Sequence, residues 1–299
     1  MNSIKKMMLS GALGCLISGM AYADGSSPQP VKPYWQDIQV VAVNKEKPRS
    51  SFMSYADRET ALTSRFEKSP YYFLLNGTWK FFFVDSYKDL PQNITDPSVN
   101  TSSWDDITVP GNWEVQGHGV AIYTNHGYEF KPRNPQPPLL PEANPVGVYR
   151  RDIEIPASWD NRDIYLHIGG AKSGLYVYLN GKEVGYSEDS KNPAEFLINK
   201  YLQPGKNVLT LKIFRWSTGS YLECQDFWRM SGIERDVFLW SQPKASIQDF
   251  RVVSTLDDTY TNGIFKLAVD LKNHTQETKN LNVGYELLDA KGNLMASEA

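Results

Sequence analysis

Short runs in which every second residue is apolar recur along much of this chain. In one of them, Leu175, Val177 and Leu179 alternate with tyrosines. The pair Asn180-Gly181 follows directly and favours a type I′ hairpin turn. No long stretch with the 3.6-residue period of a helix accompanies these runs. Many short strands joined by turns predict an all-β fold, most simply a sandwich of two sheets.

The alternating runs fall into two groups. The first group is expected to form strands at residues 79–84, 149–155, 164–168, 175–179, 184–186 and 209–213. The second group is expected at residues 247–255, 263–271 and 281–288. Because Pro243 and its polar neighbours separate the groups, we expect a first domain at 24–243 and the start of a second β-sandwich at 244–299.

The N-terminus has the pattern of a secretory signal peptide. Residues 1–6 are basic, residues 7–20 are apolar and glycine-rich, and Ala21-Tyr22-Ala23 closes the segment. We expect cleavage after Ala23 and export to the periplasm or the extracellular space. Lipidation at Cys15 is the alternative. The apolar run is too short for a good membrane span.

Composition excludes some classes of partner. The 299 residues carry a net charge of −3, which gives no basic footprint for nucleic acid and no polybasic patch for a membrane. Loss of the leader would leave Cys224 as the remaining cysteine, so we expect no internal disulfide and a buried or semi-buried thiol without a special role.

The run from Tyr221 to Val237 concentrates carboxylates, aromatic rings and arginines around Ser231-Gly232. Carboxylates accept hydrogen bonds from hydroxyls, and ring faces cover the apolar side of a pyranose. The run therefore favours a sugar site. A rigid loop held by Arg–carboxylate pairs is the simpler alternative.

Four motifs give the run a context. They are Val109–Gly117 with Ile122–Asn125, Asn144–Arg151, Ser190–Phe196 and Tyr221–Val237. In order and approximate spacing, residues 34–299 resemble the N-terminal part of glycoside hydrolase family 2, in its β-galactosidase branch. The resemblance implies a jelly-roll sugar-binding domain, followed by an immunoglobulin-like β-sandwich. Such a sandwich needs about 100 residues and seven strands, so we expect the one at 244–299 to be incomplete.

The resemblance implies two pocket residues. Asn112, in Gly111-Asn112-Trp113, and Asp226, before Phe227-Trp228, match residues that line the family's galactose pocket. Asp226 also matches a ligand of a monovalent cation, usually Na⁺, whose other ligands lie on the family's catalytic barrel. One carboxylate alone makes no such site. The alternatives are a loop-holding role for Asn112 and an arginine partner, Arg229 or Arg235, for Asp226.

The family places its catalytic glutamates on a (β/α)₈ barrel, and no helix–strand alternation of that kind occurs in this sequence. We therefore assign no catalytic residue and expect this portion alone to be inactive. The resemblance is compatible with Mg²⁺ in the full-length enzyme, bound outside this chain, and with a homo-oligomer.

Other polar candidates are weaker. His118 and His126 follow the Asn112 loop, and the mouth of the pocket is one location for them. His167 alternates with apolar neighbours and is expected to be structural. Glu188-Asp189, ahead of the Pro193-Ala194-Glu195 run, is expected to form a solvated loop.

Three functions remain open at this stage. The first is the non-catalytic N-terminal portion of a β-galactosidase that hydrolyses terminal β-D-galactosides. The second is a stand-alone secreted carbohydrate-binding module without hydrolase activity. The third is a relative of β-glucuronidases or β-mannosidases.

Overall fold

The computed structural model describes residues 32–131 and 134–298. The chain divides into two units, residues 1–32 and 33–299. The predicted signal peptide, the cleavage after Ala23 and the alternative at Cys15 lie outside the described residues. No helix in the described part is long and apolar enough to cross a membrane.

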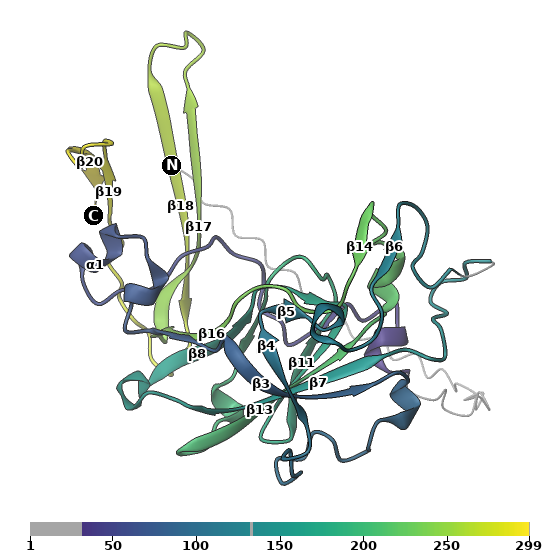
Figure 1. The fold of residues 1–299 in the computed structure, drawn as a ribbon. Coiled ribbons are helices and arrows are strands. Elements are labelled where there is room, and N and C mark those ends of the chain that lie inside the picture. The colour runs from purple at the N-terminus through teal and green to yellow at the C-terminus, as the bar shows by residue number, and fades with distance from the viewer. Residues whose placement is uncertain (1–31, 132–133, 299) are drawn as a thin grey trace, which may run out of the picture. The chain divides into compact units, whose positions relative to one another are not determined.

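One layer of the fold is a seven-stranded antiparallel sheet in the order β1-β11-β10-β13-β7-β3-β4 (Figure 1). Its strands in that order are Ala42–Val43, Lys182–Ser187, Gly174–Leu179, Lys206–Phe214, Val146–Glu154, Gly77–Val84 and Asp105–Val109. In the middle of the sheet, Leu211 of β13 lies opposite Val177 of β10 and Tyr149 of β7. All three side chains are fully buried, as their alternation predicts.

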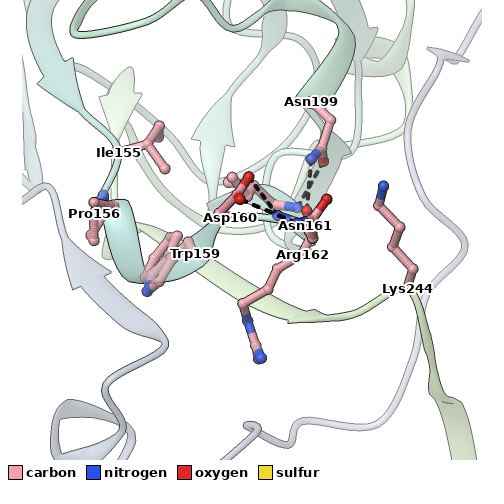
Figure 2. Close-up of a pocket in the computed structure, with 10 residues that line it drawn as sticks. Ile155, Pro156, Trp159, Asp160, Asn161, Arg162, Asn199 and Lys244 are labelled. Atoms are coloured by element: carbon pink, nitrogen blue, oxygen red, sulfur yellow. Dashed lines mark hydrogen bonds between the residues drawn. The ribbon is translucent and has the colours of Figure 1, made fainter.

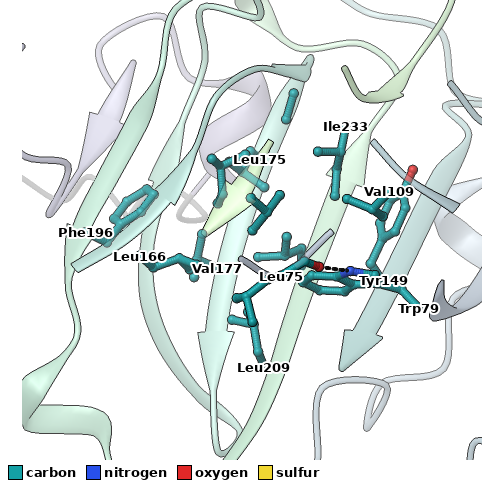
Figure 3. Close-up of a cluster of buried hydrophobic side chains, with 14 of the residues drawn as sticks. Leu75, Trp79, Val109, Tyr149, Leu166, Leu175, Val177, Phe196, Leu209 and Ile233 are labelled. Carbon is teal, nitrogen blue, oxygen red and sulfur yellow. Dashed lines mark hydrogen bonds between the residues drawn. The ribbon is translucent and has the colours of Figure 1, made fainter. Parts of the chain in front are cut away.

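The second layer is a four-stranded sheet in the order β12-β8-β16-β2. Its strands in that order are Ala194–Leu197, Arg162–Ile168, Val237–Pro243 and Tyr72–Leu74. The main hydrophobic core joins Leu166 and Phe196 of this sheet to Leu209 of the other (Figure 3). The Trp79 indole also lies in this core and donates a hydrogen bond to the Leu75 carbonyl at 2.8 Å. The two-sheet sandwich predicted from alternation is therefore confirmed.

Shorter elements are attached to the sandwich. A three-stranded sheet has the order β5-β15-β9, and a two-stranded ribbon joins β6 to β14. Their bounds are β5 (Gly111–Asn112), β15 (Gly232–Ile233), β9 (Ala171–Lys172), β6 (Ile122–Thr124) and β14 (Phe227–Arg229). Helix α1 (Arg58–Leu62) begins after Asp57, whose carboxylate accepts the Thr60 N–H. The 3-10 turns are Tyr34–Gln36, Phe66–Lys68, Tyr87–Asp89, Glu114–Gln116, Ala157–Trp159, Asn199–Tyr201 and Thr218–Tyr221.

The C-terminal segment forms two hairpins. Strand β17 (Ala245–Leu256) pairs with β18 (Gly263–Asn273), and β19 (Tyr285–Leu288) pairs with β20 (Leu294–Glu298). No described residue from 243 to 298 is buried. The strand expected at 281–288 is shorter than predicted, because residues 281–284 have no partner strand among the described residues. The domain boundary and the jelly-roll and immunoglobulin-like assignments stay predictions.

The sharpest local prediction concerns the turn between β10 and β11. Asn180 and Gly181 both have positive φ, 53° and 77°, as a type I′ turn requires. The Asn180 side chain adds hydrogen bonds to the Tyr201 carbonyl and to Asn207. The turn is therefore fixed by its backbone and by a third strand.

Candidate functional site

Trp113, the residue after Asn112, anchors the Asn112 loop in the hydrophobic core. Trp113 is fully buried and packs against Phe81 and Phe83 of β3. The backbone N–H of Trp113 donates a hydrogen bond to the Ser231 carbonyl at 3.0 Å. Asn112 is half-buried, and its Nδ2 donates to the same carbonyl at 3.2 Å. The loop-holding alternative for Asn112 thus describes one of its contacts.

Close backbone approach next to Asn112 depends on glycine. Gly232 of β15 lies opposite both Asn112 and Lys172 and has a φ of 114°. A Cβ atom at this position would come within 2.9 Å of the Gly111 carbonyl oxygen and of the Tyr149 hydroxyl. Any other residue would therefore push the Asn112 strand outward.

Asp226 lies at the start of the β6–β14 ribbon. It is exposed, and its Oδ1 accepts a hydrogen bond from the Tyr123 hydroxyl at 3.1 Å. Trp228 pairs with Tyr123 in the ribbon, and their rings lie 5.6 Å apart. The partner of Asp226 is therefore a tyrosine, whereas Arg229 bonds to the Glu223 carbonyl and Arg235 to the carbonyls of Gly169 and Lys191. The arginine alternative for Asp226 finds no support.

One chain segment connects the two candidate residues. Residues 226–233 run from Asp226 through β14 into β15, which pairs with the Asn112 strand. The Glu114 carboxylate accepts the Ser231 N–H at 2.8 Å. The Arg215 Nη2 donates to the carbonyls of Val120 and Arg229, which joins the segment that leads into β6 to strand β14.

Buried charged side chains lie on the interior side of residues 226–233. Lys172 and Glu129 form an ion pair of 2.7 Å, with side chains 2% and 5% exposed. Arg215 lies 3.7 Å from a carboxylate oxygen of Glu114 and of Glu129. Burial raises the pKa of Glu114, against the opposing effects of the Ser231 N–H and Arg215. Because such a charge is costly to bury without its partners, the network fixes the geometry of the loops.

The expectation of a solvated loop at Glu188-Asp189 is wrong for Glu188, and the nearby Glu195 is buried as well. Glu188 is 4% exposed and accepts hydrogen bonds from Tyr186, Thr218 and the Gly219 N–H. Glu195 is 8% exposed and is bonded to Arg49, His167 and Trp240. All of these partners except Tyr186 are distant in sequence, so no local pattern could have revealed the burial. Asp189 is exposed, as expected.

The histidines have separate roles. His167 stacks on Phe238 at 4.2 Å, away from the main core, as alternation predicts. His118 packs against Phe81, so it belongs to the aromatic core beside Trp113. His126 lines an open hollow of about 570 Å³ together with Tyr123 and Tyr128. Of the two histidines expected near the pocket mouth, only His126 adjoins the ribbon in the described part of the chain.

A second hollow, of about 600 Å³, lies where β8 begins, next to Asn161 and Arg162 (Figure 2). Asn199 faces it but bonds to the backbone of Arg162 and Ile164. Asp160 bonds to Asn161. These polar groups are satisfied within the protein, so we assign no site there. No group of three His, Cys, Asp or Glu side chains in residues 32–131 and 134–298 could hold a metal ion.

The chain is similar to curated proteins named β-galactosidases. A β-galactosidase from Priestia megaterium is 39% identical over 262 residues, which cover 86% of this chain and 25% of that protein. One from Oenococcus oeni is 42% identical over 185 residues, 62% of this chain and 18% of that protein. The chain spans about a quarter of the length of the curated relatives that it matches over most of its own length.

Solved structures show the fold. A β-glucuronidase from Bacteroides uniformis has a TM-score of 0.58 at 19% identity and covers 76% of this chain and 25% of that chain. The family model described as "Glycosyl hydrolases family 2, sugar binding domain" matches residues 73–243, more than half of the chain. The chain therefore belongs to glycosyl hydrolases family 2, and residues 73–243 are its sugar binding domain.

Proposed function

We propose that this chain supplies part of the galactoside pocket of a β-galactosidase, with Asn112 and Asp226 as contacts to sugar hydroxyls. The observation that carries the proposal is the exposed Asp226 carboxylate beside two exposed aromatic rings, on a segment shared with the Asn112 strand. Carboxylates and ring faces together are what a pyranose requires. We expect this chain to bind the sugar without hydrolysing it.

Relatives favour β-galactosides over other glycosides. The curated relatives at 36% and 39% identity are named β-galactosidases. The β-glucuronidases among the solved structures are about 20% identical and support the fold alone. We therefore rank a β-glucuronidase relative below a β-galactosidase.

A stand-alone carbohydrate-binding module stays the second candidate. The sandwich has its own hydrophobic core between residues 75 and 239, and Tyr123 and Trp228 of the ribbon are exposed. Binding of galactosides by this chain, together with an inactive chimera in the experiment below, would favour this module.

The cation proposal needs ligands from elsewhere. Asp226 contributes one carboxylate, and no cluster of metal-binding side chains surrounds it in the described residues. Na⁺ prefers several oxygen ligands. The described residues alone therefore do not fit a Na⁺ site, and we derive no step through the ion.

The direct test is a chimera. Residues 33–299 would replace the matching quarter of the Priestia megaterium β-galactosidase, and hydrolysis of a chromogenic β-galactoside would be measured. Asp226→Ala should lower kcat/KM by about 10- to 100-fold, because a hydrogen bond to a charged group contributes roughly 1.5–3 kcal/mol. Asn112→Ala should lower it less, because its amide is neutral.

Asp106→Ala serves as the matched control, since Asp106 is exposed in β4 and pairs with Lys80. Each variant would be checked for folding by thermal melting. If the chimera is active and both site variants keep its kcat/KM, the assignment of Asn112 and Asp226 is wrong.

A further inference from the structure

We propose that a pocket beneath residues 45–53 binds a small aromatic carboxylate, with its ring among aromatic side chains and its carboxylate at Lys45. The pocket has a volume of about 360 Å³. Small-molecule sites typically have volumes of roughly 300–1,000 Å³. None of the described residues that line it belongs to residues 109–125 or 221–237, so the inference does not rest on the proposed sugar contacts.

The floor of the pocket is the outer face of the four-stranded sheet. His167 of β8 and Phe238 of β16 stack there, with ring centroids 4.2 Å apart and planes tilted by 15°. Both lie in strands whose alternate residues enter the main core, so their own side chains point to the other face. Phe52 and Phe66 add two further rings to the lining. Such walls favour a flat aromatic ring as the ligand body.

The roof of the pocket is fixed at several points. The Glu46 N–H donates to the Glu195 carbonyl at 2.8 Å, and the Ser50 hydroxyl donates to the Phe250 carbonyl at 2.7 Å. Between these points, Arg49 donates from Nε and Nη2 to the two carboxylate oxygens of Glu195, each at 2.9 Å. The pocket is therefore preformed, and a ligand would not have to order residues 45–53 on binding.

The polar groups inside the pocket are paired with one another, which disfavours a sugar. The Glu195 carboxylate also accepts hydrogen bonds from His167 at 2.8 Å and from Trp240 at 3.0 Å. Asn192 donates to Asp189 at 2.8 Å. A pyranose has hydroxyls on most of its carbons and would bury some of them without partners, at a cost in free energy. An aromatic acid has a single polar end.

Lys45 provides a partner for that polar end. It is half-buried and lines the pocket, and it forms no ion pair or side-chain hydrogen bond within residues 32–131 and 134–298. Burial lowers the pKa of Lys45, and the charge of Asp189 opposes this shift only in part. A ligand carboxylate would give the ammonium a charge-assisted hydrogen bond. An unpaired cation beside aromatic walls therefore favours an aromatic carboxylate over a neutral or cationic aromatic ligand.

Phenylacetate is the probe, because it combines one aromatic ring with one carboxylate. It would be titrated into the full chain and followed by ligand-observed NMR. We expect saturable binding with a Kd of about 0.1–1 mM, since the ligand has only about ten non-hydrogen atoms. Phenylacetamide keeps the ring but has no charge, so its Kd should be about tenfold higher.

Substitution of Lys45 separates the charge from the fold. Lys45→Met should raise the Kd of phenylacetate about tenfold and leave the Kd of phenylacetamide nearly unchanged. A misfolded variant would weaken both ligands alike. Lys45→Arg, which keeps the charge, should recover most of the loss. Phe52→Leu should weaken both ligands by a similar factor, because it removes a ring and leaves the charge in place.

Lys88→Met is the matched control, because Lys88 is an exposed lysine that pairs with Glu142 and does not line the pocket. It should bind phenylacetate as the wild type does. Circular dichroism would confirm that each variant folds.

Absence of saturable phenylacetate binding, equal Kd values for phenylacetate and phenylacetamide, or an unchanged Kd in Lys45→Met would each overturn the inference. Methyl β-D-galactopyranoside should not displace phenylacetate, and displacement would place the acid in the sugar site and overturn the inference as well. Failure of these tests leaves the proposed function intact, since the chimera tests Asn112 and Asp226 and not the pocket beneath residues 45–53.

Discussion

The sandwich and the C-terminal hairpins use the same alternation of apolar and polar residues with opposite results. In the sandwich, strands such as β10 and β13 have partners on both sides and a second sheet across the core. Strands β17 to β20 each have one partner, and none of their described residues is buried. Alternation therefore specifies which residues share a face, and burial depends on a second layer that covers that face.

The largest difference should appear on removal of one phenylalanine from each region. Phe196 in β12 is fully buried, whereas Phe265 in β18 is half-buried and contacts Tyr285. Phe196→Ala should lower the free energy of unfolding by about 3–5 kcal/mol, because it removes apolar contacts and leaves a cavity. Phe265→Ala should cost less than about 1.5 kcal/mol, because solvent can fill the space.

Urea unfolding followed by tryptophan fluorescence measures both values. The denaturant slope should be unchanged, since neither substitution alters the surface exposed on unfolding by much. Equal losses in the two variants would show that the hairpins are covered as fully as the sandwich, and would break the comparison.

Two ion pairs test the same difference in burial between the sandwich and the C-terminal hairpins. Lys172–Glu129 is buried beneath the candidate site, and Arg58–Glu286 joins α1 to β19 with side chains 61% and 47% exposed. Lys172→Met should destabilise the protein by about 3 kcal/mol, because it leaves Glu129 buried with Arg215, 3.7 Å away, as its remaining charged neighbour. Arg58→Met should cost at most about 1 kcal/mol. Thermal unfolding at low and high salt would check this, and strong salt sensitivity of the Lys172 pair would contradict its burial.

The sequence predicted the sandwich well for a physical reason. Strand faces and the Asn180-Gly181 turn depend on local alternation and on positive φ, and both are written in neighbouring residues. Apart from the neighbouring Tyr186, the partners that bury Glu188 and Glu195 lie about 30 to 146 residues away, and no local pattern encodes them. The strand expected at 281–288 was too long, because alternation continues there without a partner strand in the described part.

The candidate site was predicted unevenly. Asn112 and Asp226 came from motif resemblance, and the structure adds the segment that connects their strands. Tyr123 was missed although it stands in a quoted motif, because its role depends on the pairing of β6 with β14. Arg215, which joins the segment that leads into β6 to strand β14, lies in no motif that we had singled out.

Removal of the hairpins should affect the sandwich modestly. Their contacts to the rest of the protein include Asp163, which accepts from His274 at 2.7 Å and pairs with Lys272 at 3.2 Å, the hydrogen bond between Ser50 and Asp249, and the exposed Arg58–Glu286 pair. Deletion of residues 244–299 returns Asp163 to water rather than burying it alone. The free energy of unfolding of the sandwich should therefore fall by no more than about 2 kcal/mol, a few degrees in Tm.

Limited proteolysis provides the measurement. Cleavage should begin within residues 244–298, where no described residue is buried, and leave the sandwich intact. The full chain should also be less soluble than residues 24–243, because single-partner strands expose unpaired edges. If residues 244–298 resist protease as firmly as the sandwich does, the predicted boundary at residue 243 is wrong.

The smallest expected effect is an opposite response of the two regions to acid. Burial raises the pKa of Glu188 in the sandwich. In the β17–β18 loop, hydrogen bonds from Thr259, Asn262 and Thr261 hold the pKa of Asp257 well below its ordinary value. Glu188 is therefore protonated at a higher pH in the folded state than in the unfolded chain. Asp257 is protonated at a lower pH in the folded state than in the unfolded chain.

The sign of each effect follows from proton linkage. As pH falls through the raised pKa of Glu188, the folded state binds more protons than the unfolded state. The free energy of unfolding therefore increases as pH falls from neutral toward the ordinary pKa of a glutamate. The unfolding free energy of the wild type relative to Glu188→Gln should rise from pH 7 to pH 5, by about 1.4 kcal/mol for each unit of pKa shift. Asp257→Asn should give no change in that range, because the stability from Asp257 is lost only as pH falls below about 4. Urea titrations at each pH measure both differences. A flat or falling difference for Glu188→Gln would show that the carboxylate is stabilised as the anion by Tyr186, Thr218 and the Gly219 N–H.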